Sequence, residues 1–147
     1  MGGMISQNKF CIINVLQKML DKLRMIEIKR AEELEISVVQ VHAIFEIGKL
    51  REVSTNEFSK ILYLDKNTVN KIVNNLVDEK FVLRHIHPEN TRHVILKLTE
   101  NGQKIYENIR DDFKLYCKRV LDNLPEKSRE SITKDFEILL KSMEDNA

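Results

Sequence analysis

The sequence predicts a mainly α-helical protein with a small β-hairpin wing, in which a winged helix-turn-helix core is flanked by long N- and C-terminal helices. Three observations support this fold class. Residues 54–80 hold two short amphipathic stretches separated by a corner, and residues 81–98 alternate between apolar and polar on both sides of a turn-forming run. Residues 6–31 and 99–143 carry apolar side chains at helical spacing.

Composition limits the class of protein. The chain has 147 residues, 42% of them hydrophobic and 32% charged, which is typical of one globular domain with its own core. It contains no run of 18 apolar residues and no secretory leader, so we expect a cytoplasmic protein with no membrane partner. The formal net charge is only +1, and residues 54–97 are the most basic segment, with seven Lys and Arg against five Asp and Glu.

The first long helix is expected from Ser6 to about Ala31. Its apolar side chains cover more than one side, which predicts burial either within one subunit or against a second one. After a short acidic connector, Ser37 is expected to begin a second helix and to form a capping box with Gln40. Gly48 is expected to end this helix. Its buried residues are predicted to be Val38, Val41, Ile44, Phe45 and Ile47.

The helix-turn-helix is predicted to begin at residue 54. Ser54 or Thr55 can cap its first helix. After a corner, Asp65 can cap a second helix, from Lys66 to about Lys80, by accepting a hydrogen bond from the Thr68 N–H. An apolar stripe on this helix is expected to face the core, namely Val69, Ile72, Val73, Leu76 and Val77.

The opposite face of the 66–80 helix is rich in asparagine, which is a mediocre helix former. Asparagine can pair with an adenine edge, lysine favours guanine or phosphate, and threonine can contact a thymine methyl group. This chemistry predicts a face that reads DNA, while a solvated surface that happens to be Asn-rich is the plainer alternative. The face comprises Lys66, Asn67, Thr68, Asn70, Lys71, Asn74 and Asn75.

A β-hairpin wing is predicted from two strands, 81–87 and 93–98. Val82 and Ile86 are expected on one face of the first strand, and Pro88 to Arg92 form a turn-forming run between the strands. A long basic side chain at a hairpin tip suits a narrow, electronegative minor groove, which predicts that role for Arg92. A single arginine in a surface loop would not establish it alone.

Two further helices are expected after the wing. Thr99 is predicted to cap a helix that runs to about Asn123, and Pro125 to open a last helix that runs nearly to the C-terminus. Both helices are amphipathic, and a compact winged core cannot cover both apolar faces. The simplest cover is a second copy of the chain, with the first and last helices of each copy interleaved.

The segment from Leu64 to Gly102 resembles the winged-helix core of the MarR (multiple antibiotic resistance regulator) family of bacterial transcription factors. The resemblance rests on the spacing and on two stretches, LDKNTVNKIVNNLVDEKFV and PENTRHVILKLTENG. Three positions depart from the family's pattern, since His87 and Asn90 stand where Asp is usual and Lys80 where Gly is usual. These departures bear on the geometry of the wing and not on the fold.

The resemblance implies a homodimeric repressor that binds a near-palindromic operator in double-stranded DNA and is released by a small-molecule effector. It implies one domain over 1–147, with a DNA-binding core at 37–99 and dimerisation helices at 5–36 and 100–147. No catalytic residue, metal or cofactor is expected, and no effector-binding residue is assigned. The predicted contacts are Asn67, Thr68, Asn70, Lys71 and Asn74 in the major groove, Arg92 in the minor groove, and Lys66, Arg84 and Lys97 on the DNA backbone.

Other functions find less support in the sequence. It has no nucleophile elbow, phosphate loop or HExxH motif, so an enzyme is not predicted. His42 stands where some metal-sensing relatives have a ligand, but no histidine follows His93 and zinc needs three or four ligands. A metal site on the hairpin formed by His85, His87 and His93 is a weaker alternative, as is a redox role for Cys11. A winged-helix protein-interaction module without DNA binding is the rival, favoured by the near-neutral charge.

Overall fold

A computed structural model describes residues 2–90 and 92–147, with side chains described from residue 11 onwards. The chain divides into two compact units, residues 1–110 and residues 111–147. The first unit contains α1 (Gly2–Leu34), α2 (Val38–Leu50), β1 (Glu52–Ser54), α3 (Thr55–Leu62), α4 (Lys66–Asp78), β2 (Val82–Ile86), β3 (Val94–Leu98) and the first part of α5 (Glu100–Asp122). The second unit contains the remainder of α5 and α6 (Glu126–Asp145).

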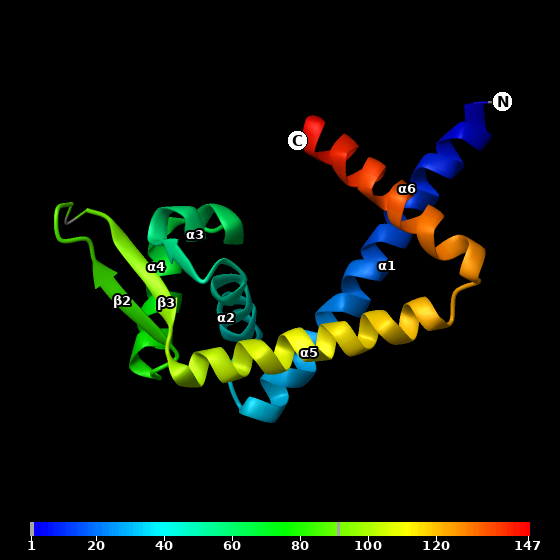
Figure 1. The fold of residues 1–147 in the computed structure, drawn as a ribbon. Helices are drawn as coiled ribbons and strands as arrows, with labels where there is room; N and C mark the ends of the chain where they lie inside the picture. Colours follow the sequence, from blue (N-terminus) through cyan, green and yellow to red (C-terminus); the bar gives the residue numbers. More distant parts are fainter. Residues whose placement is uncertain (1, 91) are drawn as a thin grey trace. The chain divides into compact units, whose positions relative to one another are not determined.

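The predicted fold class is confirmed, because the first unit has a helix-turn-helix followed by a β-hairpin, between long helices. In Figure 1, α2, α3 and α4 gather beside the base of the hairpin, and its tip extends away from them. Ser37 caps α2 in the predicted capping box with Gln40, and Ser54 caps α3 by accepting from the Glu57 N–H. The hydrogen-bonding residues at these helix starts were thus readable from the sequence.

The sheet has a third strand that the sequence analysis did not predict. The strand order is β1-β3-β2, and both pairings are antiparallel. β1 is only three residues long and pairs through Val53 with Leu96, which is too short to show the alternation that identifies a strand. The predicted face of the hairpin is confirmed, since Val82 and Ile86 lie directly opposite Leu98 and Val94.

The core of the first unit lies between the sheet and helices α2 to α5. Phe58 of α3, Leu76 of α4 and Leu96 of β3 are all 0% exposed. Of the residues predicted to be buried in α2, Val38 is exposed in its first turn and Phe45 is half-buried. The further fully buried side chains are Ile44, Ile47, Val41, Val53, Val69, Val73, Val82 and Ile109. This interior fixes α4 and the wing as parts of one body.

Gly48 does not end α2, which corrects the prediction. The helix continues to Leu50 and is closed by Arg51, whose backbone has φ 66 and ψ −51. Gly48 is buried, and a Cβ built on it would lie 2.3 Å from the ring of Tyr106. The glycine therefore serves a close approach between α2 and α5 and not a helix terminus.

The base of the wing is held by Thr99 and Gly102. The Thr99 hydroxyl donates to the Lys80 carbonyl at 2.6 Å and accepts from the Gly102 N–H at 3.1 Å, so it caps α5 as predicted. A Cβ on Gly102 would lie 2.1 Å from the Phe81 carbonyl oxygen. Lys80 itself has φ 64, so it adopts the left-handed backbone for which glycine is usual. These contacts tie the start of β2 to the first turn of α5.

The long terminal helices leave large apolar side chains exposed in the single chain. In α1, Ile12, Val15 and Met25 are more than half exposed, and α6 has no buried residue. The large apolar residues of α5 and α6 in the second unit that are between 41% and 69% exposed are Leu115, Val120, Phe136, Ile138, Leu140 and Met143. Within the part of the chain that the structure describes, no helix is apolar over a stretch that could cross a membrane.

Candidate nucleic-acid interface

Helix α4 starts at a fixed point because its N-terminus is capped. The carboxylate of Asp65 accepts from the Thr68 N–H at 2.8 Å and from the Thr68 hydroxyl at 3.0 Å. The hydrogen bond from the Thr68 N–H, followed by that from its hydroxyl, lowers the pKa of Asp65, which therefore keeps its charge at neutral pH. The predicted cap is confirmed, and it makes Thr68 a member of the cap as well as of the outer face.

The predicted outer face of α4 is presented to solvent. Val69, Val73 and Leu76 are buried on the opposite side of the same helix, so its rotation about its axis is fixed by the core. The polar side chains that the rotation leaves exposed are Lys66, Asn67, Asn70, Lys71, Asn74 and Asn75, whereas Thr68 is half-buried. Six hydrogen-bonding or cationic side chains are therefore available in one row along the helix.

Arg84 of β2 joins this row. Its guanidinium donates a hydrogen bond to the side-chain oxygen of Asn74. Arg84 lies opposite Leu96 in the sheet, so the two share the sheet face that packs against α4. The contact holds a cation beside the C-terminal half of the α4 row and leaves the amide NH₂ of Asn74 as a donor.

Lys97 lies on the other face of the hairpin from Arg84. In the sheet, Lys97 is paired with Leu83 of β2 on one side and with Glu52 of β1 on the other. Its Nζ lies 3.2 Å from a Glu52 carboxylate oxygen. Lys97 also lines a cavity of about 860 Å³ together with Arg51 and Arg110. The structure therefore groups Lys97 with this cavity and not with the α4 row. The sequence had predicted that Lys97 and Arg84 both contact the DNA backbone.

The wing tip is shaped by Asn90. Its side-chain oxygen accepts from the backbone N–H of Arg92 at 3.2 Å, and its carbonyl accepts from the His93 N–H at 2.9 Å. The His87 N–H donates to the His93 carbonyl at 2.9 Å and closes the hairpin. Arg92 is exposed at this tip, and residue 91 of the predicted turn lies outside the described residues. Asn90 therefore orients the main chain of Arg92, and no charged side chain takes part in these bonds.

The hairpin histidines do not converge as a group of three. The rings of His87 and His93 are 6.1 Å apart and meet edge to face, whereas His85 is opposite Ile95 in the sheet. Across residues 2–90 and 92–147, no group of three or more His, Cys, Asp or Glu side chains is arranged to hold a metal ion. Cys11 and Cys117 are both exposed free thiols.

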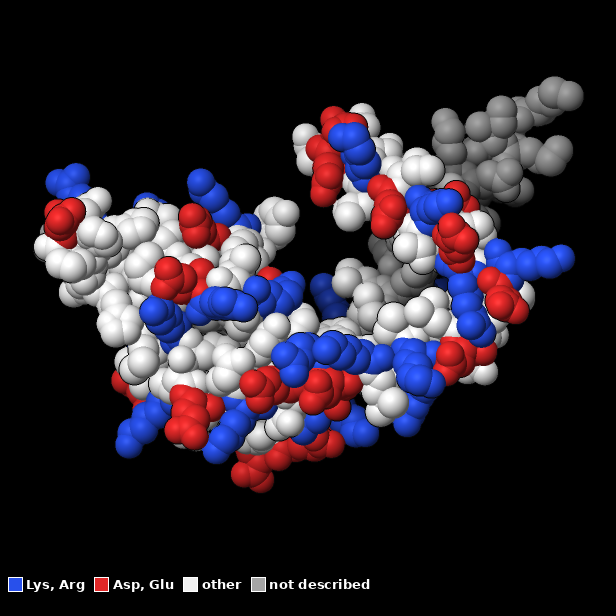
Figure 2. Space-filling model, viewed as in Figure 1, with Lys and Arg blue, Asp and Glu red and all other residues white. Residues whose placement is uncertain are grey.

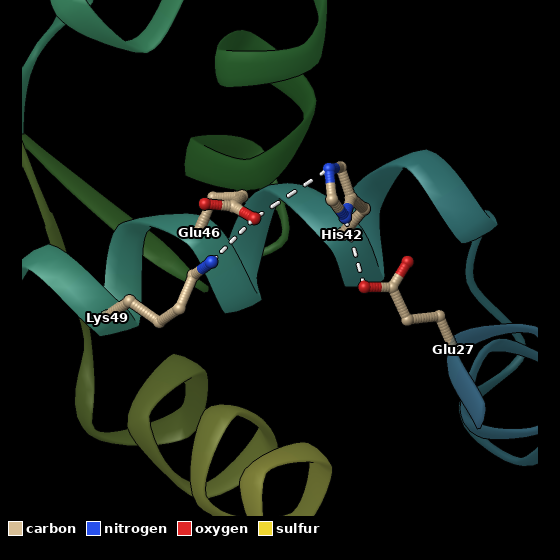
Figure 3. Close-up of polar contacts among 4 residues, drawn as sticks. All are labelled: Glu27, His42, Glu46 and Lys49. Carbon is tan, nitrogen blue, oxygen red and sulfur yellow. Dashed lines mark hydrogen bonds and ion pairs between the residues drawn. The ribbon is translucent and has the colours of Figure 1, made fainter. Parts of the chain in front are cut away.

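His42 belongs to a polar cluster between α1 and α2. Its Nδ1 lies 3.0 Å from Glu27 of α1, and its Nε2 lies 4.0 Å from Glu46, which also pairs with Lys49 at 2.9 Å (Figure 3). Glu27 is buried, and the hydrogen bond from His42 to Glu27 raises the pKa of the histidine above its ordinary value. His42 is therefore hydrogen-bonded but only half-buried, and when protonated it is an ionic link from α1 to the winged core.

The corner between α3 and α4 contains an exposed residue that the sequence analysis treated only as a turn. Tyr63 is 94% exposed and has φ 54 and ψ 38, the left-handed conformation. The corner is braced by the Ser59 hydroxyl, which donates to the Leu64 carbonyl at 2.8 Å. The signal for an unusual residue was present in the sequence, because glycine or asparagine is the common choice after a helix.

Charge does not distinguish this surface strongly. Figure 2 shows Lys and Arg side chains interspersed with Asp and Glu over the winged part of the chain, on the face that it presents. The positive groups beside the Asn-rich row are Lys66, Lys71 and Arg84. The arrangement suits recognition by hydrogen bonds more than by a broad positive field.

Comparison with known proteins identifies the same region. Residues 36–94 match the model of the MarR family. The HTH-type transcriptional regulator PchR of Bacillus subtilis is 24% identical over 115 residues, which cover 76% of this chain and 68% of that protein. FabT of Streptococcus pneumoniae, solved in complex with DNA, superposes with a TM-score of 0.79 at 24% identity and covers 92% of this chain and 97% of that one. A MepR–DNA complex from S. aureus superposes with a TM-score of 0.71 at 20% identity, and the match covers 88% of this chain and 96% of that one.

Proposed function

Because residues 36–94 form a winged helix-turn-helix domain of the MarR family, we propose that this protein is a sequence-specific DNA-binding transcriptional regulator. The observation that carries the proposal is the row of exposed amide and cationic side chains along α4, with Arg84 held against it by Asn74. The chains of similar fold that were solved with DNA, FabT and MepR, support it. The protein acts as a regulator and not as an enzyme, and its place of action is the cytoplasm, where DNA is found.

In this proposal α4 lies in the major groove. Asn67 and Asn70 offer the paired donor and acceptor that an adenine edge requires, and Lys71 suits guanine or phosphate. Asn74 offers its amide NH₂ as a donor, because its side-chain oxygen accepts from Arg84. Thr68 contributes its methyl group, because its hydroxyl is already bonded to the cap. Base contacts of this kind carry the sequence specificity, since phosphate contacts alone do not distinguish sequences.

The remaining contacts position the protein on the duplex. Arg92 enters the minor groove from the wing tip, where a narrow groove attracts a guanidinium. Lys66 and Arg84 contact phosphates on either side of the groove that α4 occupies. Lys97 can reach a phosphate only from the opposite face of the hairpin, so we rank it below Lys66 and Arg84.

The functional form is a homodimer. α1 and α6 each expose large apolar side chains, which a second copy of the chain would bury, and exposed apolar patches mark interaction sites. A two-fold dimer presents two α4 helices to successive major grooves, roughly 34 Å apart, and so reads a near-palindromic operator.

The regulator represses until a small-molecule effector changes its shape. Binding of this effector would alter the separation of the two α4 helices, which then no longer match the spacing of the half-sites. Such a ligand can shift the equilibrium only by the difference between its affinities for the two conformations.

The direct test is a fluorescence-anisotropy titration of the purified protein against the DNA immediately upstream of its own gene. Random DNA of equal length is the control, and both are titrated at two salt concentrations. We expect tighter binding to the upstream DNA and a steep loss of affinity with salt, because each phosphate contact releases counterions. Binding that is equally weak for both DNAs and insensitive to salt would favour the rival function, a protein-interaction module.

A further inference from the structure

Tyr63 occupies its corner at an energetic cost. Its φ of 54 and ψ of 38 place a bulky residue in the left-handed region, which glycine adopts freely and residues with a side chain adopt at a cost. The backbone role is to end α3, since the Tyr63 N–H donates to the Lys60 carbonyl at 3.2 Å and the Leu64 N–H to the Ser59 carbonyl at 3.3 Å. Glycine would perform this role equally well, so the tyrosine side chain is not needed for the turn itself.

The Tyr63 side chain does not stabilise the folded chain by packing. Tyr63 is 94% exposed, so its ring buries almost no apolar area and offsets none of the backbone strain by packing. Strained residues persist where the surrounding structure holds them, and they cluster at functional sites. Here the surrounding structure is the brace from Ser59 to Leu64 and the Asp65 cap on α4.

The position of the corner indicates what the ring meets. Tyr63 is four residues ahead of Asn67, so their Cα atoms lie within roughly 14 Å of each other. The major groove is about 12 Å wide, so a residue this close to a helix in the groove is within reach of the phosphates at its edge. A tyrosine hydroxyl is an ordinary donor to phosphate oxygens, and its ring can pack on the adjoining deoxyribose.

We infer that Tyr63 is a further DNA-contact residue, whose hydroxyl donates to a backbone phosphate at the edge of the groove that α4 enters. The inference rests on the proposed function, since it requires α4 to lie in the major groove. A DNA contact would explain why a strained residue is kept at this corner, since the left-handed backbone directs the ring away from the protein and toward the duplex. The contact fixes the depth and register of α4 without adding a charge.

The first test compares Tyr63→Phe with the parent protein on the upstream DNA probe. The substitution keeps the ring and the backbone and removes only the hydroxyl, so we expect affinity to fall roughly fivefold to tenfold. The slope of log affinity against log salt should stay unchanged, because a neutral donor releases no counterion, whereas Lys71→Ala should reduce it by about one. A Tyr63→Phe protein that binds as tightly as its parent would overturn the inference.

A second variant separates the contact from the strain. Tyr63→Gly relieves the left-handed backbone, so its melting temperature should be unchanged or higher while its DNA affinity falls at least as far as that of Tyr63→Phe. Glu35→Gly is the matched control, because Glu35 is also an exposed residue with positive φ, at 55, but lies between α1 and α2. That control should keep the DNA affinity of the parent.

The phosphate itself can be located by replacing single phosphates of the probe with uncharged methylphosphonates. In the parent protein, the phosphate that Tyr63 contacts should give a loss of affinity, and in Tyr63→Phe that loss should disappear at one position in each half-site. Identical scans for the two proteins would overturn the inference while leaving the proposed function intact. If the parent protein itself does not prefer the upstream DNA to random DNA at any salt concentration, both fail together. A loss of affinity caused by weaker self-association, seen by sedimentation, would assign Tyr63 to a subunit contact instead.

Discussion

The winged core buries its large apolar side chains, whereas the terminal helices expose theirs. Phe58 of α3 is 0% exposed, whereas Phe136 of α6 is 41% exposed in the single chain. Every element of the core contributes a fully buried apolar side chain, but α6 contributes none. The core therefore holds the interior that one chain can build, and the terminal helices carry apolar faces that need another molecule. This difference predicts two separable parts of stability, one within the chain and one that depends on concentration.

The largest effect should come from a matched pair of phenylalanine substitutions. Phe58→Ala removes a fully buried ring and should lower the free energy of unfolding by about 3–5 kcal/mol at any protein concentration. Phe136→Ala should leave the unfolding of the isolated chain nearly unchanged and weaken dimerisation, because its ring is exposed until a second copy covers it. Denaturant titration at several concentrations, with sedimentation of both variants, measures the two effects. Concentration-independent destabilisation by Phe136→Ala would remove the distinction.

The next effect concerns the join between the winged core and α5. Gly102→Ala would place a Cβ 2.1 Å from the Phe81 carbonyl oxygen, and backbone atoms cannot move aside as a flexible side chain can. We expect a loss of about 1–3 kcal/mol in the free energy of unfolding, together with weaker DNA binding because the base of the wing must shift. The neighbouring exposed Asn101→Ala is the control and should change neither. A Gly102→Ala protein with parental melting temperature would show that the wing is not anchored here.

A third substitution separates DNA binding from self-association. Arg92→Ala removes the exposed guanidinium at the wing tip and should weaken DNA binding about tenfold, as expected for one well-placed contact. Dimerisation should be unaffected, because the wing belongs to the winged core and not to the terminal helices whose apolar faces are exposed. Arg119→Ala, an exposed arginine of α5, should leave DNA affinity unchanged. Anisotropy and sedimentation give the two readouts, and an Arg92→Ala protein that binds DNA like its parent would refute the role of the wing.

Local rules made the fold predictable, and long-range contacts set the limits of that prediction. The caps at Ser37, Ser54 and Asp65 use side-chain hydrogen bonds over three residues, so the sequence alone contains both partners. Gly48 was misassigned because its partner, Tyr106, is 58 residues away, and only the fold brings its ring to the α2 backbone. The same reason hid β1, whose single line of pairing is with β3.

The sequence predicted which α4 residues share one helix face, but not which residues of the hairpin lie beside that face. Helical spacing puts Asn67, Asn70 and Asn74 on one face, and this follows from the sequence without knowledge of the fold. The sequence could not show that Arg84 and Lys97 lie on opposite faces, because this depends on the register of the hairpin. Their assignment to DNA remains a prediction for mutagenesis to test.

The smallest effect tests the ionic link from α1 to the winged core. The hydrogen bond from His42 to the buried carboxylate of Glu27 raises the histidine pKa in the folded state, whereas the unfolded value is near 6.5. Between those two values the folded state binds more protons, so stability is fully present below pH 6.5 and is lost as pH rises through the folded pKa. His42 is partly exposed, so we expect a loss of less than about 1 kcal/mol.

Melting temperatures across this pH window measure the effect, and Glu27→Gln should flatten the slope because it removes the carboxylate that favours protonated His42. Glu46→Gln is the graded control, since Glu46 lies 4.0 Å from the other ring nitrogen and should flatten it less. Stability that rises with pH over the same window would contradict the assignment. Protonation of His42 strengthens a contact between α1 and α2, so the stability that this contact contributes falls as the pH rises.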